Sequence, residues 1–136
     1  MLETDKAWLA GIIDGEGCIS IHSRANHFVP IVKIANTNDL LINHCKLILD
    51  GAGIDYCVTF NDRGDRKNAK PSWELSLESR PRVISVLNMV HPYLVSKKAQ
   101  ADLVLKWCGK SKRAKSDTET NFIPNIRFLN HRGRVK

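Results

Sequence analysis

The apolar residues of this chain alternate between helical and strand spacing, and the pattern predicts a helix followed by two strands, twice in succession. The first unit starts with a helix that Thr4 caps and that ends near Gly15. Residues 18–36 then alternate between apolar and polar side chains, which predicts two strands joined near Asn26. The chain therefore begins with a helix and an antiparallel strand pair.

The second unit has the same order. Asn38 can cap a helix that Gly51 and Gly53 end. Residues 54–60 and 72–77 predict a second strand pair, connected by a long basic loop. Two units of this kind imply an α+β fold, in which a four-stranded antiparallel sheet has its helices packed on one face.

Two further helices and a tail follow the second strand pair. Pro81 fits the first turn of one helix, which Pro92 ends, and Ser96 can cap the next helix. Residues 110–121 predict a flexible basic linker, and the apolar residues 122–129 predict a short segment that docks on the domain.

The chain has 136 residues and a formal net charge of +7, most of which lies near the C-terminus. Residues 1–109 contain 13 basic and 12 acidic side chains, whereas residues 110–136 contain 8 and 2. We therefore predict one globular domain over residues 1–110 and a basic extension over residues 111–136. The basic excess favours a polyanion such as nucleic acid as partner, although a basic tail also occurs in proteins that use it only for solubility.

The sequence predicts neither a membrane segment nor a redox or zinc site. No apolar run approaches the roughly 20 residues of a spanning helix, and the first residues, MLETDKAW, carry acids where a signal peptide is basic and apolar. We expect an intracellular protein, in the cytoplasm or in an organelle that contains DNA. The four cysteines lack metal-ligand spacing and are predicted to be buried thiols: Cys18, Cys45, Cys57 and Cys108.

The predicted strands carry polar side chains on the face that the helices leave open. Such a face is either simply solvated or contacts base edges in the major groove of DNA. A basic loop beside it favours DNA, and we include Asn26 at the first turn among the contacts. The polar strand residues are Ser20, His22, Arg24, Lys33, Glu74 and Ser76. The basic loop residues are Arg63, Arg66, Lys67 and Lys70.

The direction of residues 56–61 stays open in the sequence. In a regular strand, Val58 and Phe60 point into the core, and Thr59 and Asn61 point outward toward DNA. A β-bulge would exchange the two sets. Thr59 and Asn61 are included among the predicted DNA contacts, and both directions of the strand stay open.

The first helix carries a stripe of small side chains. Ala7, Gly11 and Gly15 recur every four residues, beside Ala10 and Asp14. A glycine inside a helix costs about 1 kcal/mol relative to alanine, so the stripe indicates close contact with another helix. That helix belongs either to a second copy or to the chain's own core. We predict that Ala7, Ala10, Gly11 and Asp14 form an interface between two copies.

Glu16 stands between Gly15 and Gly17 at the end of this helix, where the helix dipole is unfavourable to a carboxylate. A positive charge is therefore expected nearby. If two copies pack their first helices about a twofold axis, both Glu16 carboxylates and nearby carbonyls, including that of Gly15, meet at one position. Oxygen ligands of this kind suit Mg²⁺.

These residues resemble a known motif. Residues 8–17, WLAGIIDGEG, are similar to the signature helix of the LAGLIDADG homing endonucleases. Ile12 stands in place of leucine, Gly15 in place of alanine and Glu16 in place of the second aspartate. The resemblance also covers the order of elements over about residues 4–109, which is that of the family's αββαββα core. The positions that match letter for letter are Leu9, Ala10, Gly11, Ile13, Asp14 and Gly17.

The resemblance implies three catalytic residues. Residues 92–107 are similar to the segment that places a lysine beside the cleavage site in single-motif members, which implies that Lys97 is the active-site lysine. Asn36, at the end of the second strand, is implied to order water around the metal ions. Glu16 takes the place of the metal-binding acid.

A single motif implies a homodimer that forms one saddle over double-stranded DNA. Its twofold symmetry implies a long, pseudo-palindromic target, in which both strands are cut with Mg²⁺ as cofactor. The alternative from another class is a protein of this fold that has lost cleavage, acting as a group I intron maturase with intron RNA as partner or as a DNA-binding regulator. The acid at Glu16 favours the nuclease.

Overall fold

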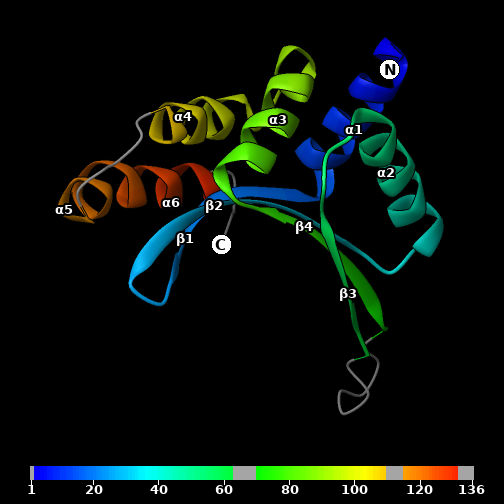
Figure 1. The fold of residues 1–136 in the computed structure, drawn as a ribbon, viewed down its shortest axis with the longest axis horizontal. Helices are drawn as coiled ribbons and strands as arrows, with labels where there is room; N and C mark the ends of the chain where they lie inside the picture. Colours follow the sequence, from blue (N-terminus) through cyan, green and yellow to red (C-terminus); the bar gives the residue numbers. More distant parts are fainter. Residues whose placement is uncertain (1, 63–69, 110–114, 132–136) are drawn as a thin grey trace.

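A computed structural model of the chain describes residues 2–62, 70–109 and 115–131 (Figure 1). The strands are β1 (Gly17–Arg24), β2 (His27–Asn36), β3 (Cys57–Asn61) and β4 (Ser72–Glu78). The main helices are α1 (Glu3–Glu16), α2 (Asp39–Ala52), α3 (Arg80–Val90) and α4 (Lys98–Cys108). Shorter helical segments are η1 (His91–Tyr93), α5 (Lys115–Asp117), η2 (Thr118–Phe122) and α6 (Ile123–His131).

The four strands form one antiparallel sheet in the order β1-β2-β4-β3. The sheet is arched, its two hairpins descend on either side, and the main helices lie above it (Figure 1). Ile19 pairs with Val32, and Ile34 pairs with Leu75, so that apolar side chains of neighbouring strands share the helix-covered face. The predicted α+β fold, with a four-stranded antiparallel sheet and helices on one face, is confirmed.

The hydrophobic core lies between this sheet face and the helices. Leu9 and Ile13 of α1 are completely buried against strand residues such as Ile34 and Leu75. Leu87 of α3 joins the same cluster with no exposed surface. Each fully buried side chain of this size stabilises the fold by about 1.5–3 kcal/mol. The packed core therefore fixes where α1 ends and the first strand begins.

The caps of α2 agree with the sequence at Asn38 and Gly53, although Gly51 lies inside the helix, and the caps predicted for α1 and α4 are wrong. Asn38 Oδ1 accepts a hydrogen bond from the backbone N–H of Leu40 at 3.0 Å, and Gly53 ends α2 with a left-handed φ of 71°. The prediction that Thr4 caps α1 is wrong, because α1 already includes it. Ser96 does not cap α4 either, because its hydroxyl donates to a carbonyl of α1.

The C-terminal segment is more ordered than its composition predicts. Residues 115–121, expected to be part of a flexible linker, are helical, and residues 110–114 of that linker lie outside the described part. Thr118 is buried because its hydroxyl accepts a hydrogen bond from Trp107 Nε1 at 3.0 Å. The predicted docking of residues 122–129 agrees with the burial of Phe122 and Ile126.

None of the helices in the described segments has the length and apolarity needed to cross a membrane. The cysteines differ from the prediction in part. Cys45 and Cys108 are buried, and burial raises the pKa of both thiols to about 11. Cys18 is half-buried and Cys57 is exposed, because β3 lies at the sheet edge.

Candidate active site and nucleic-acid interface

The chain passes from α1 into β1 without a loop. The backbone N–H of Gly17 donates to the carbonyl of Ile13, so the first strand residue also closes the last helical turn. A Cβ at Gly17 would lie 2.8 Å from Ile13 Cα and 2.9 Å from Ile13 O. Only glycine fits this junction without displacing backbone. The tight junction places Glu16, the last helical residue, in an exposed position at the helix end.

A chain of hydrogen bonds orients the Glu16 carboxylate. Asn36 Nδ2 donates to Glu16 Oε2 at 2.5 Å, and the backbone N–H of Asn38 donates to Asn36 Oδ1 at 2.7 Å. Because a backbone N–H can only donate, it fixes the Asn36 amide with its oxygen toward Asn38 and its nitrogen toward Glu16. The carboxylate is therefore held by the start of the α2 segment.

Asp14 fastens the end of α1 to the segment that leads into α4. The backbone N–H groups of Val95 and Lys97 donate to the two Asp14 carboxylate oxygens at 2.8 and 3.0 Å. Lys97 Nζ donates to the Asp14 carbonyl at 2.6 Å, and the Ser96 hydroxyl donates to the same oxygen at 3.3 Å. Lys97 thus supplies the positive charge expected at the helix end.

The stripe of small residues on α1 is largely open to solvent. Ala7, Gly11 and Gly15 are exposed, and a Cβ at either glycine would meet no atom within 4 Å. The stripe therefore does not face the chain's own core at these positions. Two residues depart from the predicted interface: Ala10 is completely buried in the core, and the Asp14 carboxylate is bonded within the chain.

The end of α1 offers oxygen atoms of the kind that hold Mg²⁺. Glu16 contributes an exposed and oriented carboxylate, and the last carbonyls of a helix, including that of Gly15, lack partners within the helix. Among the described residues, no three His, Cys, Asp or Glu side chains cluster to form a complete metal site. The donor set fits Mg²⁺ only if a second copy or a bound phosphate adds ligands.

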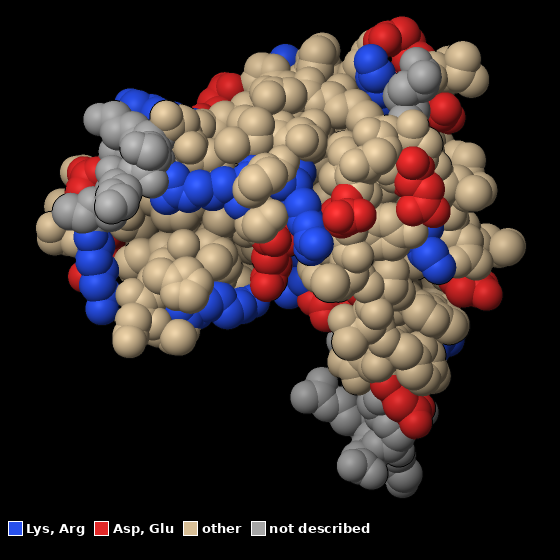
Figure 2. All heavy atoms as spheres, in the orientation of Figure 1, with Lys and Arg blue, Asp and Glu red and all other residues tan. Residues whose placement is uncertain are grey.

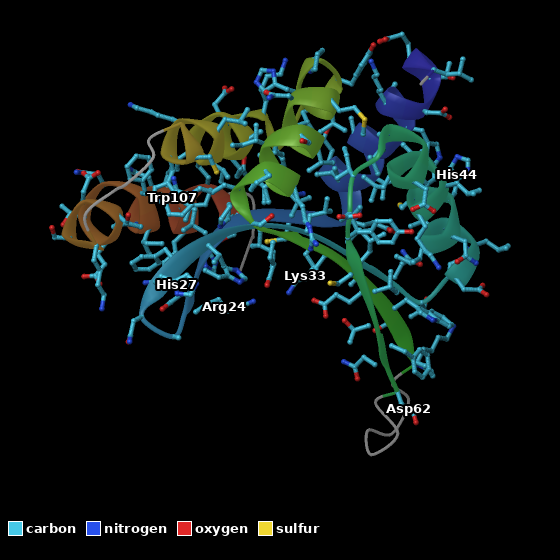
Figure 3. All side chains as sticks on the ribbon, viewed as in Figure 1. Arg24, His27, Lys33, His44, Asp62 and Trp107 are labelled. Atoms are coloured by element: carbon cyan, nitrogen blue, oxygen red, sulfur yellow. The ribbon has the colours of Figure 1, made fainter. Side chains whose placement is uncertain are left out.

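The sheet face opposite the helices carries charged side chains in two ion pairs. Arg24 Nη2 lies 2.6 Å from Glu78 Oε1, and Lys33 Nζ lies 3.0 Å from Glu74 Oε1. Arg24 and Lys33 extend from the sheet on the side away from the helices (Figure 3). Both predicted basic contacts therefore lie on the open face, each bound to a carboxylate of β4.

Three further predicted contacts lie on two strands of the sheet, Ser20 and His22 on β1 and Ser76 on β4. Ser76 pairs with Lys33 and is half-buried. Burial lowers the pKa of His22, and the charges of Arg24 and Lys33 lower it further. Ser20 departs from the prediction, since only 8% of it is exposed, in a pocket between β1 and α6, and it offers little to a macromolecule.

Strand pairing settles the direction of β3. Thr59 pairs with Glu74 and Asn61 pairs with Ser72 without a bulge, so both point to the open face. Val58 and Phe60 are 38% and 53% exposed, in contrast to the predicted core positions. The reason is that β3 is an edge strand that descends beyond the helices (Figure 1).

The two hairpin ends carry the remaining predicted contacts. Asn26 is exposed at the β1–β2 turn, beside Ala25, whose φ is 51°. Lys70 is exposed just before β4. Arg63, Arg66 and Lys67 lie in residues 63–69, outside the part of the chain that the structure describes.

Sequence reasoning missed two features of the site. Glu78 lies on the open face because it follows Glu74 and Ser76 in alternation, and extending the fourth strand by one residue would have found it. The bonds from Asp14 to Val95 and Lys97 connect residues more than 80 positions apart, and no local pattern indicates them.

The chain belongs to the LAGLIDADG family, because the family model described as a LAGLIDADG-like domain matches residues 3–100. The homing endonuclease I-CvuI, in complex with its target in the presence of Ca, is 25% identical, with a TM-score of 0.62. The match covers 79% of this chain and 67% of that one.

Two other proteins are also similar to this chain. The archaeal intron-encoded homing endonuclease I-Vdi141I, in complex with DNA, is 14% identical with a TM-score of 0.60, and covers 79% of this chain and 68% of its own, which supports the fold. The uncharacterized protein MJ0314 of Methanocaldococcus jannaschii is 42% identical over 52 residues. That match covers 38% of this chain and 20% of the relative, so the chain spans a fifth of that protein.

Proposed function

We propose that this protein is a homing endonuclease that makes a double-strand break in a long, pseudo-palindromic DNA site as a homodimer with Mg²⁺. The observation that carries the proposal is the end of α1, where Glu16 is exposed and oriented by Asn36 while Lys97 is bonded to Asp14 of the same helix end. Membership in the LAGLIDADG family and the DNA-bound structures of I-CvuI and I-Vdi141I support DNA as the substrate.

Glu16 and the Gly15 carbonyl of each subunit would hold the metal ions. A bound Mg²⁺ supplies two effects, activation of a water molecule and stabilisation of negative charge on the phosphate. Asn36 holds the Glu16 carboxylate in one orientation and orders water at the same site. Lys97 provides positive charge near the scissile phosphate. These are the roles that the geometry supports for the chain's own groups.

The exposed stripe on α1 supports the proposed homodimer. Ala7, Gly11 and Gly15 leave room for a second helix to approach closely, and Glu16 lies at the end of that stripe. An isologous contact between two α1 helices brings both Glu16 side chains to the twofold axis. Each active site is then incomplete without the second copy, in agreement with the absence, among the described residues, of a cluster of three His, Cys, Asp or Glu side chains.

Cleavage of a plasmid that carries the native insertion site tests the proposal. With Mg²⁺ the wild type linearises the plasmid, and Glu16→Gln slows cleavage by about 1000-fold or more because a neutral amide replaces the anionic ligand. Glu16→Gln still binds the same duplex. Glu119→Gln, which removes an exposed carboxylate on η2, serves as the control and cuts normally.

The same samples distinguish the alternatives. The mass of the protein–DNA complex gives two chains per duplex if the homodimer forms, and one chain contradicts it. Binding without nicking by the wild type contradicts the endonuclease and favours a DNA-binding regulator. Binding of intron RNA in place of duplex DNA favours a maturase.

A further inference from the structure

The described strand residues of the open sheet face carry no net charge, which is unusual for a surface proposed to contact a polyanion. Over the described strand residues, its charged side chains are Arg24, Lys33, Glu74 and Glu78, two of each sign. Figure 2, in which the sheet is seen from the side, shows Lys and Arg side chains next to Asp and Glu side chains on the visible surface. A carboxylate near phosphates is repelled, so the two acids need a role that outweighs this cost.

Both acids hold a basic side chain in place. Arg24 of β1 reaches across β2 to Glu78 of β4 at 2.6 Å, and Lys33 of β2 reaches Glu74 of β4 at 3.0 Å. The side chains of the first pair are 47% and 39% exposed, and those of the second pair are 34% and 36% exposed. Ion pairs with this exposure contribute little to folding stability, so stability does not account for the acids.

Each pair presents donors and acceptors side by side toward solvent. A guanidinium has five N–H donors and a carboxylate has about four lone-pair sites, so one mutual contact leaves most of them available. A phosphate offers acceptors only and cannot satisfy the carboxylate. A G·C base pair offers both kinds of partner in the major groove, since guanine O6 and N7 accept and the cytosine amino group donates.

We infer that Glu78 is a specificity-determining residue, which forms with Arg24 a single reading unit for one G·C base pair. Arg24 donates to guanine while Glu78 accepts from the cytosine amino group of the same or the adjacent pair. Lys33 and Glu74 form a second unit of the same kind. The inference rests on the proposed function, because it requires this face to lie in the major groove.

The neighbouring His22 agrees with recognition of bases through hydrogen-bond donors and acceptors. Its pKa is lowered by burial and by Arg24 and Lys33, while Glu78 opposes the change. The ring is then neutral at pH 7 and adds no positive charge that would attract phosphates regardless of sequence. Recognition on this face therefore depends on matched donors and acceptors rather than on net charge.

Selection from a randomised duplex library, with Ca²⁺ in place of Mg²⁺, tests the inference. The wild type selects G·C at one position in each half-site, and Glu78→Gln lowers discrimination at that position by about 10-fold while binding unselected DNA more tightly. Glu74→Gln changes a different position. Glu119→Gln, on η2 outside the sheet, leaves the selected sequence unchanged.

The outcomes separate the inference from the proposed function. If the wild type selects a site and Glu78→Gln selects it with equal discrimination, the ion pair is only structural and the inference is overturned. If the wild type selects no duplex sequence, the proposed site-specific endonuclease is contradicted, and the inference that depends on it is overturned as well. Circular dichroism confirms that each variant is folded, and Glu74→Gln provides an independent test if Glu78→Gln is not.

Discussion

The end of α1 and the open face of the sheet are both polar and exposed, but their hydrogen bonds have different partners. At the end of α1, the backbone N–H groups of Asn38, Val95 and Lys97 donate to side chains at 2.7 to 3.0 Å. On the sheet face, Arg24 and Lys33 are bound to other side chains.

This difference has a physical consequence. Backbone groups are held in place by the packed core and cannot rotate away, whereas surface side chains exchange partners at little cost. The site proposed for cleavage is therefore held in one arrangement within the chain, as preorganised catalysis would require. The face proposed to contact DNA is satisfied by internal ion pairs that can be exchanged for contacts to bases.

The largest effect is expected from a substitution at the junction between α1 and β1. Gly17→Ala places a Cβ 2.8 Å from Ile13 Cα, and we expect a loss of about 2 kcal/mol or more in the free energy of unfolding. Gly109→Ala is the matched control, because a Cβ there lies 3.4 Å from the nearest atoms, an ordinary van der Waals contact, and Gly109 is outside the proposed interface and metal site. Urea unfolding of both variants measures the difference, and equal destabilisation contradicts the rigid junction.

A smaller effect is expected when the orientation of the carboxylate is lost. Asn36→Ala removes the donor to Glu16, and we expect the cleavage rate to fall about 10- to 100-fold, because small misplacements of reacting groups have effects of this size. DNA affinity and the urea midpoint change little, since one exposed hydrogen bond contributes only about 1 kcal/mol.

The control for Asn36→Ala is Asn121→Ala. Asn121 Nδ2 also donates to a carboxylate, that of Asp117 at 2.6 Å, but on the C-terminal helices. This variant should cut DNA at the wild-type rate. A normal rate for Asn36→Ala would show that Glu16 does not depend on its partner.

The smallest expected effect is a change in the pH dependence of folding stability, which comes from His22 on the sheet face. The folded state lowers the pKa of His22 through burial, Arg24 and Lys33, against the opposing effect of Glu78. As pH falls below about 6.5, the unfolded chain binds a proton that the folded chain takes up less readily, so stability decreases. We expect this decrease between pH 8 and pH 5.5 to be smaller in His22→Gln, measured as the difference in urea unfolding from the wild type. A larger decrease in stability in His22→Gln than in the wild type would mean that folding raises the pKa of His22.

Much of the fold could be predicted because its signals are local. Alternation located all four strands, and Asn38 and Gly53 marked the ends of α2 correctly. The caps of α1 and α4 were predicted wrongly because hydroxyl residues near helix starts also bond elsewhere, as Ser96 does. The helix at residues 115–121 was missed because its burial depends on Thr118 meeting Trp107.

The candidate site could be predicted only in part. Glu16, Asn36 and Lys97 were singled out, and the structure brings Asn36 to Glu16 and Lys97 to the end of the same helix. Asp14 was predicted at the interface between two copies, and its carboxylate accepts hydrogen bonds from the backbone N–H groups of Val95 and Lys97, which the sequence did not indicate. Whether the exposed stripe meets a second copy stays a prediction.

The sequence by itself determined the order of helices and strands up to the end of α4, the glycine at the α1–β1 junction and the acid beside it, since these depend on conformations of a few neighbouring residues. Only the tertiary structure decided that Ala10 is buried while Gly11 is exposed, and that Arg24 binds Glu78 54 positions away. Packing and strand register bring such residues together, and neither is encoded in a local pattern.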